Sequence, residues 1–209
     1  MKLSLTRELS LIVVVLLPLI YLAYLWADLP DSVPLHWNIE GEVDRYGNKS
    51  ELILIPFLLP ILTYVIFLVA PYIDPKNKLK SKDSKFNKLK TLMIVFMSIL
   101  AIYILNASKN ESLSSPNSIV MLIGVLYIAL GNYFKTIKPN YFIGIRTPWT
   151  LENENIWRKT HKMAGKMWFI GGLIVVLNSF TLEEQINLYV FLAVTGIISI
   201  IPMIYSYLK

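Results

Sequence analysis

Long apolar runs separated by short polar segments dominate the pattern of this chain. Six runs approach the roughly 20 residues of helix that cross a bilayer, and they occupy residues 9–27, 52–73, 89–107, 118–134, 167–180 and 186–207. The fourth run carries Gly124 and Gly131 on one face, a spacing that lets another helix approach closely. The pattern predicts an all-α polytopic membrane protein with six transmembrane helices.

The first run follows Lys2 and Arg7 and resembles a signal peptide in this respect. It lacks a small-residue cleavage site and has the length of a span, so we interpret it as a retained helix that Pro18 can kink. The sequence shows neither an internal repeat nor a low-complexity linker. We therefore treat residues 1–209 as a single membrane domain.

The composition fits a membrane solvent, because 55% of the residues are hydrophobic and the mean hydropathy is +0.55. The sequence contains no cysteine, which excludes disulfides and thiolate metal sites. A net charge of +6 would suggest nucleic-acid binding in a soluble protein. Here we expect no direct nucleic-acid partner, because the position of the charges relative to the spans matters more than their sum.

The basic residues divide unequally between the two sides of the membrane. If the amino terminus lies inside, the inner segments hold seventeen of the twenty Lys and Arg residues, and the outer segments keep only Arg45, Lys49 and Lys109. Segment 74–90 alone contributes seven lysines; we interpret it as a solvated loop beside anionic lipid, with a dedicated partner-binding role as the alternative. This bias predicts that both termini are cytoplasmic, an N-in/C-in topology.

The outer segment at residues 28–51 is polar and acidic, and its two prolines and two glycines favour a compact ordered loop over a helix. On a helix, the spacing of His36, Glu40 and Asp44 would suit a metal ion. Gly41 and the flanking prolines argue against a helix, so we expect no metal at these residues.

The densest cluster of polar, basic and aromatic residues lies between the fourth and fifth runs, at residues 139–166. Pro148 fixes a turn there, and we expect Thr150 to cap a helix over 151–166. On that helix Trp157 and His161 fall on one face and the basic residues on the other. Such an interfacial amphipathic helix would lie on the membrane surface before turning into the fifth span.

Two side chains of this cluster are candidates for chemistry. Arg146 offers a planar fork that can bind a phosphate or a carboxylate, with a snorkelling arginine as the alternative. His161 could carry a proton or contact a headgroup, but a histidine whose hydrogen bonds are satisfied at the interface is the simpler interpretation. The sequence holds no Walker loop, HExxH motif, nucleophile elbow or pair of catalytic carboxylates, and no acidic, lysine, arginine or histidine residue deep within a run. We therefore predict neither an enzyme nor a cofactor, and the pattern disfavours an ion-coupled pump.

Two strings in the chain resemble the patterns of known bacterial membrane proteins. The outer string PLHWNIEGEVDRYGNK resembles the P-x-H-W-N-x-x-G-x-x-D-x-Y pattern of an uncharacterised membrane domain, through Pro34, His36, Trp37, Asn38, Gly41, Asp44 and Tyr46. The inner string NYFIGIRTPWTLENENIWRKTH resembles the pattern N-x-x-x-G-I-R-T-P-W-T-L...W-x-x-T-H, through Asn140, Gly144, Ile145, Arg146, Thr147, Pro148, Trp149, Thr150, Leu151, Trp157, Thr160 and His161. In this order, and at this chain length, the two strings together resemble the SdpI family of immunity proteins.

The resemblance implies a multi-pass protein of the bacterial cell membrane that gives resistance to a secreted membrane-active peptide toxin of the sporulation-delaying type. In the best known case the protein is also a receptor that holds a transcriptional repressor at the membrane, which implies a cytoplasmic repressor as a second partner. The toxin-facing candidates are then His36, Trp37, Asn38, Gly41, Asp44 and Tyr46. The inner candidates are Asn140, Gly144, Arg146, Thr147, Pro148, Trp149, Trp157 and His161.

Two other classes of protein stay open on the sequence, namely a small membrane transporter and a membrane enzyme that acts on a lipid or a peptide. Uptake or efflux measured in vesicles would identify the transporter. Product formation by the purified protein would identify the enzyme.

The first prediction concerns topology. Ser32→Cys and Asn153→Cys, each introduced into this cysteine-free chain, should differ in their reaction with a membrane-impermeant thiol reagent on intact cells. The charge bias predicts labelling at position 32 and protection at position 153. Permeabilised cells, in which both positions should react, are the control. Labelling at 153 with protection at 32 would reverse the predicted topology.

Overall fold

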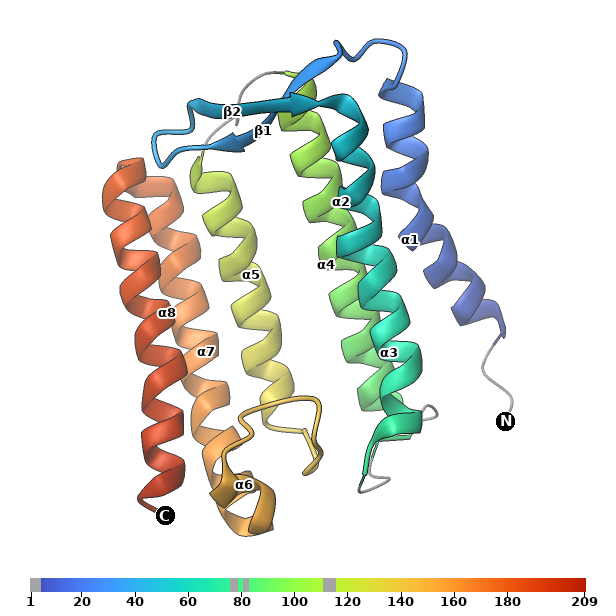
Figure 1. The fold of residues 1–209 in the computed structure, drawn as a ribbon. Coiled ribbons are helices and arrows are strands. Elements are labelled where there is room, and N and C mark those ends of the chain that lie inside the picture. The colour runs from blue at the N-terminus through green and yellow to red at the C-terminus, as the bar shows by residue number, and fades with distance from the viewer. Residues whose placement is uncertain (1–4, 76–78, 81–82, 111–115) are drawn as a thin grey trace. The chain divides into compact units, whose positions relative to one another are not determined.

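The computed structural model describes residues 5–75, 79–80, 83–110 and 116–209, and most of these are helical (Figure 1). The predicted positions Lys2, Lys76, Lys78 and Lys82, with residues 111–115 of the link between the third and fourth runs, lie outside the described residues. The elements are α1 Leu5–Leu25, β1 Ser32–Trp37, β2 Val43–Asn48, η1 Lys49–Ile53, α2 Leu54–Pro56, η2 Phe57–Ile61, α3 Leu62–Ile73, α4 Ser84–Lys109, α5 Pro116–Phe134, α6 Pro148–Glu152, α7 Glu154–Thr181 and α8 Glu184–Tyr207.

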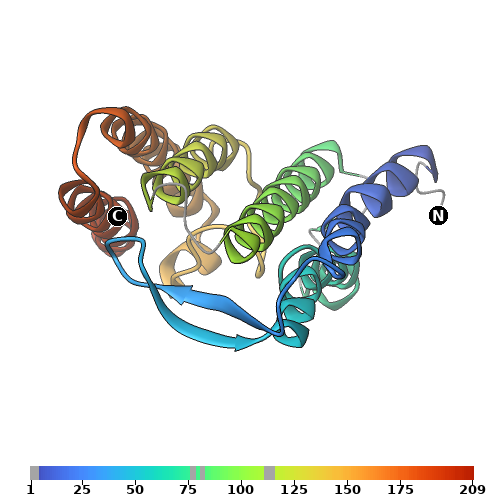
Figure 2. The same ribbon diagram turned by 90° about the horizontal axis from the view of Figure 1, so that it is seen from above.

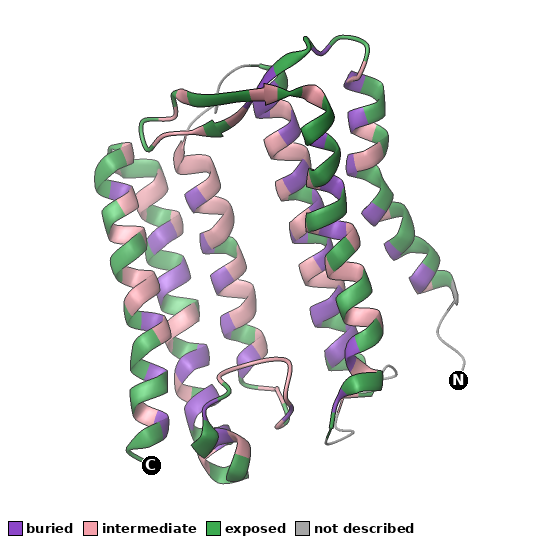
Figure 3. Ribbon diagram, viewed as in Figure 1, coloured by how far each residue is buried: buried purple, intermediate pink, exposed green. Residues whose placement is uncertain are grey.

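Six helical segments among the described residues are long and apolar enough to cross a membrane, which confirms the predicted fold class. Many of their large apolar side chains are exposed in the isolated protein, such as Ile20, Ile66, Leu177 and Ile200 (Figure 3). In water such surfaces would favour aggregation, whereas in a bilayer they meet lipid. The span formed by α8 shows this most clearly, since only 11% of the residues in its most apolar stretch are buried inside the protein.

The contacts divide the chain into two compact units. The first takes Met1–Pro71 and Lys80–Ser114, and the second takes Tyr72–Leu79 and Ser115–Lys209. The single membrane domain expected from the sequence stays a prediction.

In the first unit, the end of α1 packs against the start of the hairpin and against α4. Leu22 and Leu25 of α1 share one buried cluster with Val33 of β1, Leu52 of η1 and Leu105 of α4. This cluster holds the hairpin at the end of the unit where α1 finishes (Figures 1 and 2).

The outer segment, expected to be an ordered loop, is an antiparallel hairpin of β1 and β2. Its register pairs Ser32 with Asn48 and Trp37 with Val43, with an irregularity around His36. Asn48 then caps the following helical turn, because its side chain accepts a hydrogen bond from the backbone N–H of Ser50 at 2.9 Å. The hairpin is the one β structure among the described residues of a helical protein.

In the second unit, α5, α7 and α8 run side by side, and α6 lies at the end where α8 finishes (Figures 1 and 2). Glycines bring α5 and α7 into backbone contact: a Cβ added at Gly165 would lie 2.7 Å from the carbonyl oxygen of Gly131, and one added at Gly172 would lie 2.6 Å from that of Gly124. Both distances are too short for any side chain. The predicted close approach at Gly124 and Gly131 is confirmed, and it depends on glycines of both helices.

Helix α7 combines two elements that the sequence analysis treats as separate. The amphipathic segment and the fifth span form one continuous helix from Glu154 to Thr181, so the predicted interfacial helix is not a separate element. The face that carries Trp157 and His161 is buried within the protein rather than in the membrane surface, while Arg158 and Lys162 on the opposite face are exposed, as expected. The helix continues because its small residues pack against α5 and its sequence contains no proline.

A buried ion pair joins α1 to α4 in the first unit. The Lys90 ammonium lies 2.6 Å from the Glu8 carboxylate, and these residues are only 2% and 6% exposed. The hydroxyl of Tyr64 donates to the same carboxylate oxygen at 3.1 Å, and Lys90 lies 4.7 Å from the centre of the Tyr64 ring. The prediction of a solvated 74–90 loop is therefore wrong for Lys90, because α4 begins at Ser84 and turns this lysine toward α1.

The second prediction follows from this pair. Lys90→Met leaves the Glu8 carboxylate buried without its counter-charge, so the free energy of unfolding in detergent should fall by about 3–5 kcal/mol. Lys88→Met changes an exposed lysine of the same helix and should have little effect. Glu8→Gln combined with Lys90→Met should regain part of the loss. Equal unfolding free energies for the two single variants would contradict a structural role for the pair.

Candidate functional site

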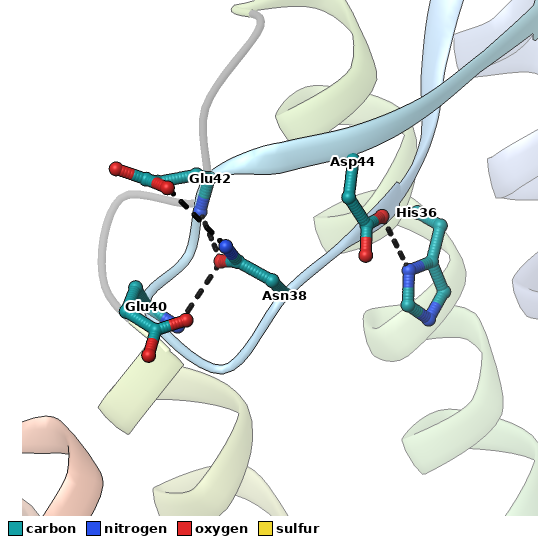
Figure 4. A network of polar contacts seen from close by, with 5 residues as sticks. All are labelled: His36, Asn38, Glu40, Glu42 and Asp44. Carbon is teal, nitrogen blue, oxygen red and sulfur yellow. Dashed lines mark hydrogen bonds and ion pairs between the residues drawn. The ribbon is translucent and has the colours of Figure 1, made fainter.

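The tip of the hairpin is built around the side chain of Asn38 (Figure 4). Its amide oxygen accepts hydrogen bonds from the backbone N–H groups of Glu40 and Glu42 at 3.1 and 2.8 Å, and its nitrogen donates to the Glu42 carboxylate at 3.2 Å. Gly41 turns the chain with a φ of 79°, a conformation that glycine adopts without strain. Asn38 and Gly41 therefore fix the shape of the tip.

The other outer candidates lie along the strands. The ring nitrogen Nδ1 of His36 lies 2.6 Å from the Asp44 carboxylate across the hairpin, and both side chains are exposed (Figure 4). Trp37 is half-buried, and its indole N–H has no hydrogen-bond partner among the described residues. Tyr46 is 53% exposed. The hairpin thus presents a fixed surface of one His–Asp hydrogen-bonded pair, two aromatic rings and several acids.

The inner candidates gather at the end of the second unit, where the 136–147 loop folds onto α7 and α8. Asn140, only 2% exposed, holds the start of this loop. Its side-chain oxygen accepts from the N–H groups of Phe142 and Ile143 at 2.8 and 2.7 Å, and its nitrogen donates to the Lys138 and Ile143 carbonyls at 2.9 and 3.2 Å. The Asn140 side chain therefore supplies backbone groups of this loop with the hydrogen-bond partners that regular secondary structure would otherwise provide.

His161 attaches the middle of the loop to α7. The N–H of Ile145 donates to its Nε2 at 2.9 Å, and its Nδ1 lies 2.9 Å from the Trp157 carbonyl oxygen. A carbonyl can only accept, so Nδ1 carries the proton and the imidazole is neutral. Gly144, with a φ of 107°, passes so close to this ring that an added Cβ would collide with Nε2. Both ring nitrogens are thus engaged by backbone.

Three hydroxyl groups fix the turn into α6. Thr147, rather than the predicted Thr150, is the N-cap, and the two threonines exchange hydrogen bonds in a capping box with Pro148 at the first helical position. The Thr147 hydroxyl also lies 2.9 Å from that of Ser206 on α8. Asn153 caps α7 by accepting from the N–H groups of Asn155 and Ile156. The cap prediction at Thr150 is wrong because the helix it should start is interrupted at Asn153.

Aromatic rings connect the loop to the interior of the second unit. Trp157 is 1% exposed, donates its indole N–H to the Ile137 carbonyl at 2.9 Å and stacks on His161 with ring centres 4.1 Å apart. Phe134 meets His161 on one side and Trp168 on the other, at 6.0 and 5.0 Å. These contacts make the position of the loop depend on α5 and α7 together.

Arg146, Pro148 and Trp149 are exposed members of the inner motif. The guanidinium of Arg146 donates to the Tyr141 carbonyl, and Trp149, 40% exposed, meets the ring of Tyr207 at 4.9 Å. Arg146 also borders a cavity of about 250 Å³ beside α8. The α8 residues of this cavity, Ile198, Ser199 and Met203, carry no local signal in the sequence, because they lie more than 50 positions after Arg146.

Comparisons with known proteins match both motif regions. Residues 136–206 match the SdpI/YfhL protein family, and residues 13–59 match a domain of unknown function, DUF1648. The chain is 27% identical over 203 residues to the "Immunity protein SdpI" of Bacillus subtilis (strain 168), which covers 95% of this chain and 94% of that protein. It is 36% identical over 60 residues to an uncharacterized protein of Archaeoglobus fulgidus, covering 25% of this chain and 33% of that protein. No solved structure matches. These matches confirm the predicted family resemblance.

The third prediction tests the attachment of the loop. Trp157→Ala removes a fully buried ring and leaves the Ile137 carbonyl without its donor, so the free energy of unfolding should fall by about 3–5 kcal/mol. Trp149→Ala removes an exposed ring of the same motif and should cost much less. Chemical denaturation in detergent measures both. A similar loss in the two variants would contradict a special role for Trp157.

Proposed function

We propose that this multi-pass bacterial membrane protein, whose residues 136–206 match the SdpI/YfhL family, is an immunity protein that protects its host from a secreted membrane-active peptide toxin. The observation that carries the proposal is the similarity to the Bacillus subtilis immunity protein, which extends over 95% of the chain and includes both motif regions. A partial match to one motif would support a shared fragment only. Similarity over the whole length supports a shared role.

The hairpin is the surface that we assign to the toxin. The exposed side chains of His36 and Asp44 offer polar partners to an arriving peptide. Asn38 fixes the tip before any peptide binds, so little conformational entropy is lost on binding. We further propose that the toxin is of the sporulation-delaying type.

The opposite face of α7 supports a second, cytoplasmic partner. Arg158, Lys159, Lys162 and Lys166 are all exposed along it. A basic stripe of this kind attracts an acidic protein surface or anionic lipid headgroups. We extend the proposal to a receptor role in which this stripe holds a transcriptional repressor at the membrane.

The fourth prediction tests immunity directly. Expression of the full chain in a sensitive bacterium should raise survival against a cognate toxin from a panel of membrane-active peptides, including the sporulation-delaying type. The peptide recovered from the medium should have an unchanged mass. Asn38→Ala, which removes the hydrogen bonds that order the tip, should lower protection, while Glu40→Gln should keep it.

Three outcomes would contradict this function. A cleaved or modified peptide would identify an enzyme, and toxin export from loaded vesicles would identify a transporter. Unchanged survival across the panel, with the protein present at normal levels in the membrane, would exclude immunity to this class of peptide. Membrane levels of each variant serve as the control.

A further inference from the structure

The cavity beside Arg146 combines a cation with an apolar wall. Arg146 and Thr147 of the loop line it on one side, and Trp168 of α7 with Ile198, Ser199 and Met203 of α8 line the other. The Ser199 hydroxyl makes no hydrogen bond to any residue that the structure describes. A site of this composition suits a ligand with an anionic head and an apolar continuation.

Arg146 has hydrogen-bonding capacity left for such a head. A guanidinium carries five N–H groups, and one nitrogen of Arg146 donates to the Tyr141 carbonyl. That bond holds one edge of the guanidinium of an otherwise exposed side chain in place. The remaining donors form a planar fork that matches the oxygen atoms of a phosphate.

The depth of the cavity fits the boundary between headgroups and acyl chains. Helix α8 ends at Tyr207, so at 1.5 Å per residue Met203 lies about 6 Å and Ile198 about 14 Å inside that end. Arg146 lies in the loop that leads into α6 at the same end of the unit (Figure 1). The cation is therefore at headgroup level, and the apolar wall extends toward the hydrocarbon.

The size of the cavity limits what can enter it. A volume of about 250 Å³ equals that of roughly eight water molecules at about 30 Å³ each. This is enough for one phosphodiester and a few methylene groups. The rest of an acyl chain would stay in the bilayer beside Met203.

We propose that this cavity binds an anionic phospholipid from the leaflet at the α6 end. The phosphodiester lies on the guanidinium of Arg146, and the first carbons of an acyl chain lie against Trp168 and Ile198. The inference goes beyond immunity and does not depend on it, since no toxin takes part.

The fifth prediction uses the purified full chain in a zwitterionic detergent. Added phosphatidylglycerol should raise the midpoint of thermal unfolding, and phosphatidylcholine with the same acyl chains should raise it much less. Arg146→Gln should weaken the apparent affinity for phosphatidylglycerol about tenfold or more, the equivalent of one lost charge-assisted pair. Arg146→Lys should recover only part of it, because an ammonium lacks the planar fork.

Two further variants separate the cavity from general surface charge. Arg158→Gln removes an exposed arginine of α7 that does not line the cavity, and it should bind phosphatidylglycerol like the unaltered protein. Ser199→Leu fills the apolar side without changing any charge, and it should weaken lipid binding. Inorganic phosphate alone should give little stabilisation, because it leaves the apolar wall uncovered.

The proposal would be overturned by any of three results. Equal losses in Arg146→Gln and Arg158→Gln would indicate nonspecific attraction to the basic stripe. Full stabilisation by inorganic phosphate would identify a free anion instead of a lipid. Normal lipid affinity in Ser199→Leu would show that the cavity stays empty when lipid binds. Circular dichroism of each variant confirms that it is folded.

Discussion

The structure depends on one constraint of the bilayer: a backbone carbonyl group within it cannot accept a hydrogen bond from water, so the protein must supply the donor. A proline within a helix removes the N–H that would bond the carbonyl four residues earlier. Pro18 frees the carbonyl of Val14, which accepts from the Ser98 hydroxyl at 3.1 Å, and Pro202 frees that of Ile198, which accepts from the Trp168 indole at 2.9 Å. Each proline thereby ties its helix to a neighbour.

The second of these bonds determines the geometry of the inner motif. Once Trp168 is held by α8, its ring supports Phe134, and Phe134 supports His161 in turn. The motif therefore contains two kinds of residue. Asn140 and His161 direct their polar atoms to backbone groups of the loop and of α7, whereas Arg146 stays at the surface with further donors available.

The sequence predicted what depends on local pattern. The six apolar runs, the close approach at Gly131 and the ordered outer segment all follow from composition and spacing, and the structure confirms them. The ion pair of Glu8 with Lys90 joins residues 82 positions apart, so no local pattern reports it. The same holds for the cavity, which α8 completes. The sequence does not indicate that α7 is continuous, for a related reason. Its polar first half has the pattern of a surface helix, and only the packing against α5 distinguishes the two.

Because Gly144 contacts His161, the residue at one of these positions limits which residue can occupy the other. Any other residue at 144 would have to adopt a left-handed backbone and displace the imidazole that holds Ile145. The imidazole, in turn, loses one of its two partners if the loop takes another path. Among homologues we therefore expect the glycine and the histidine to be lost together. An alignment read column by column would record two substitutions where the protein underwent one structural change.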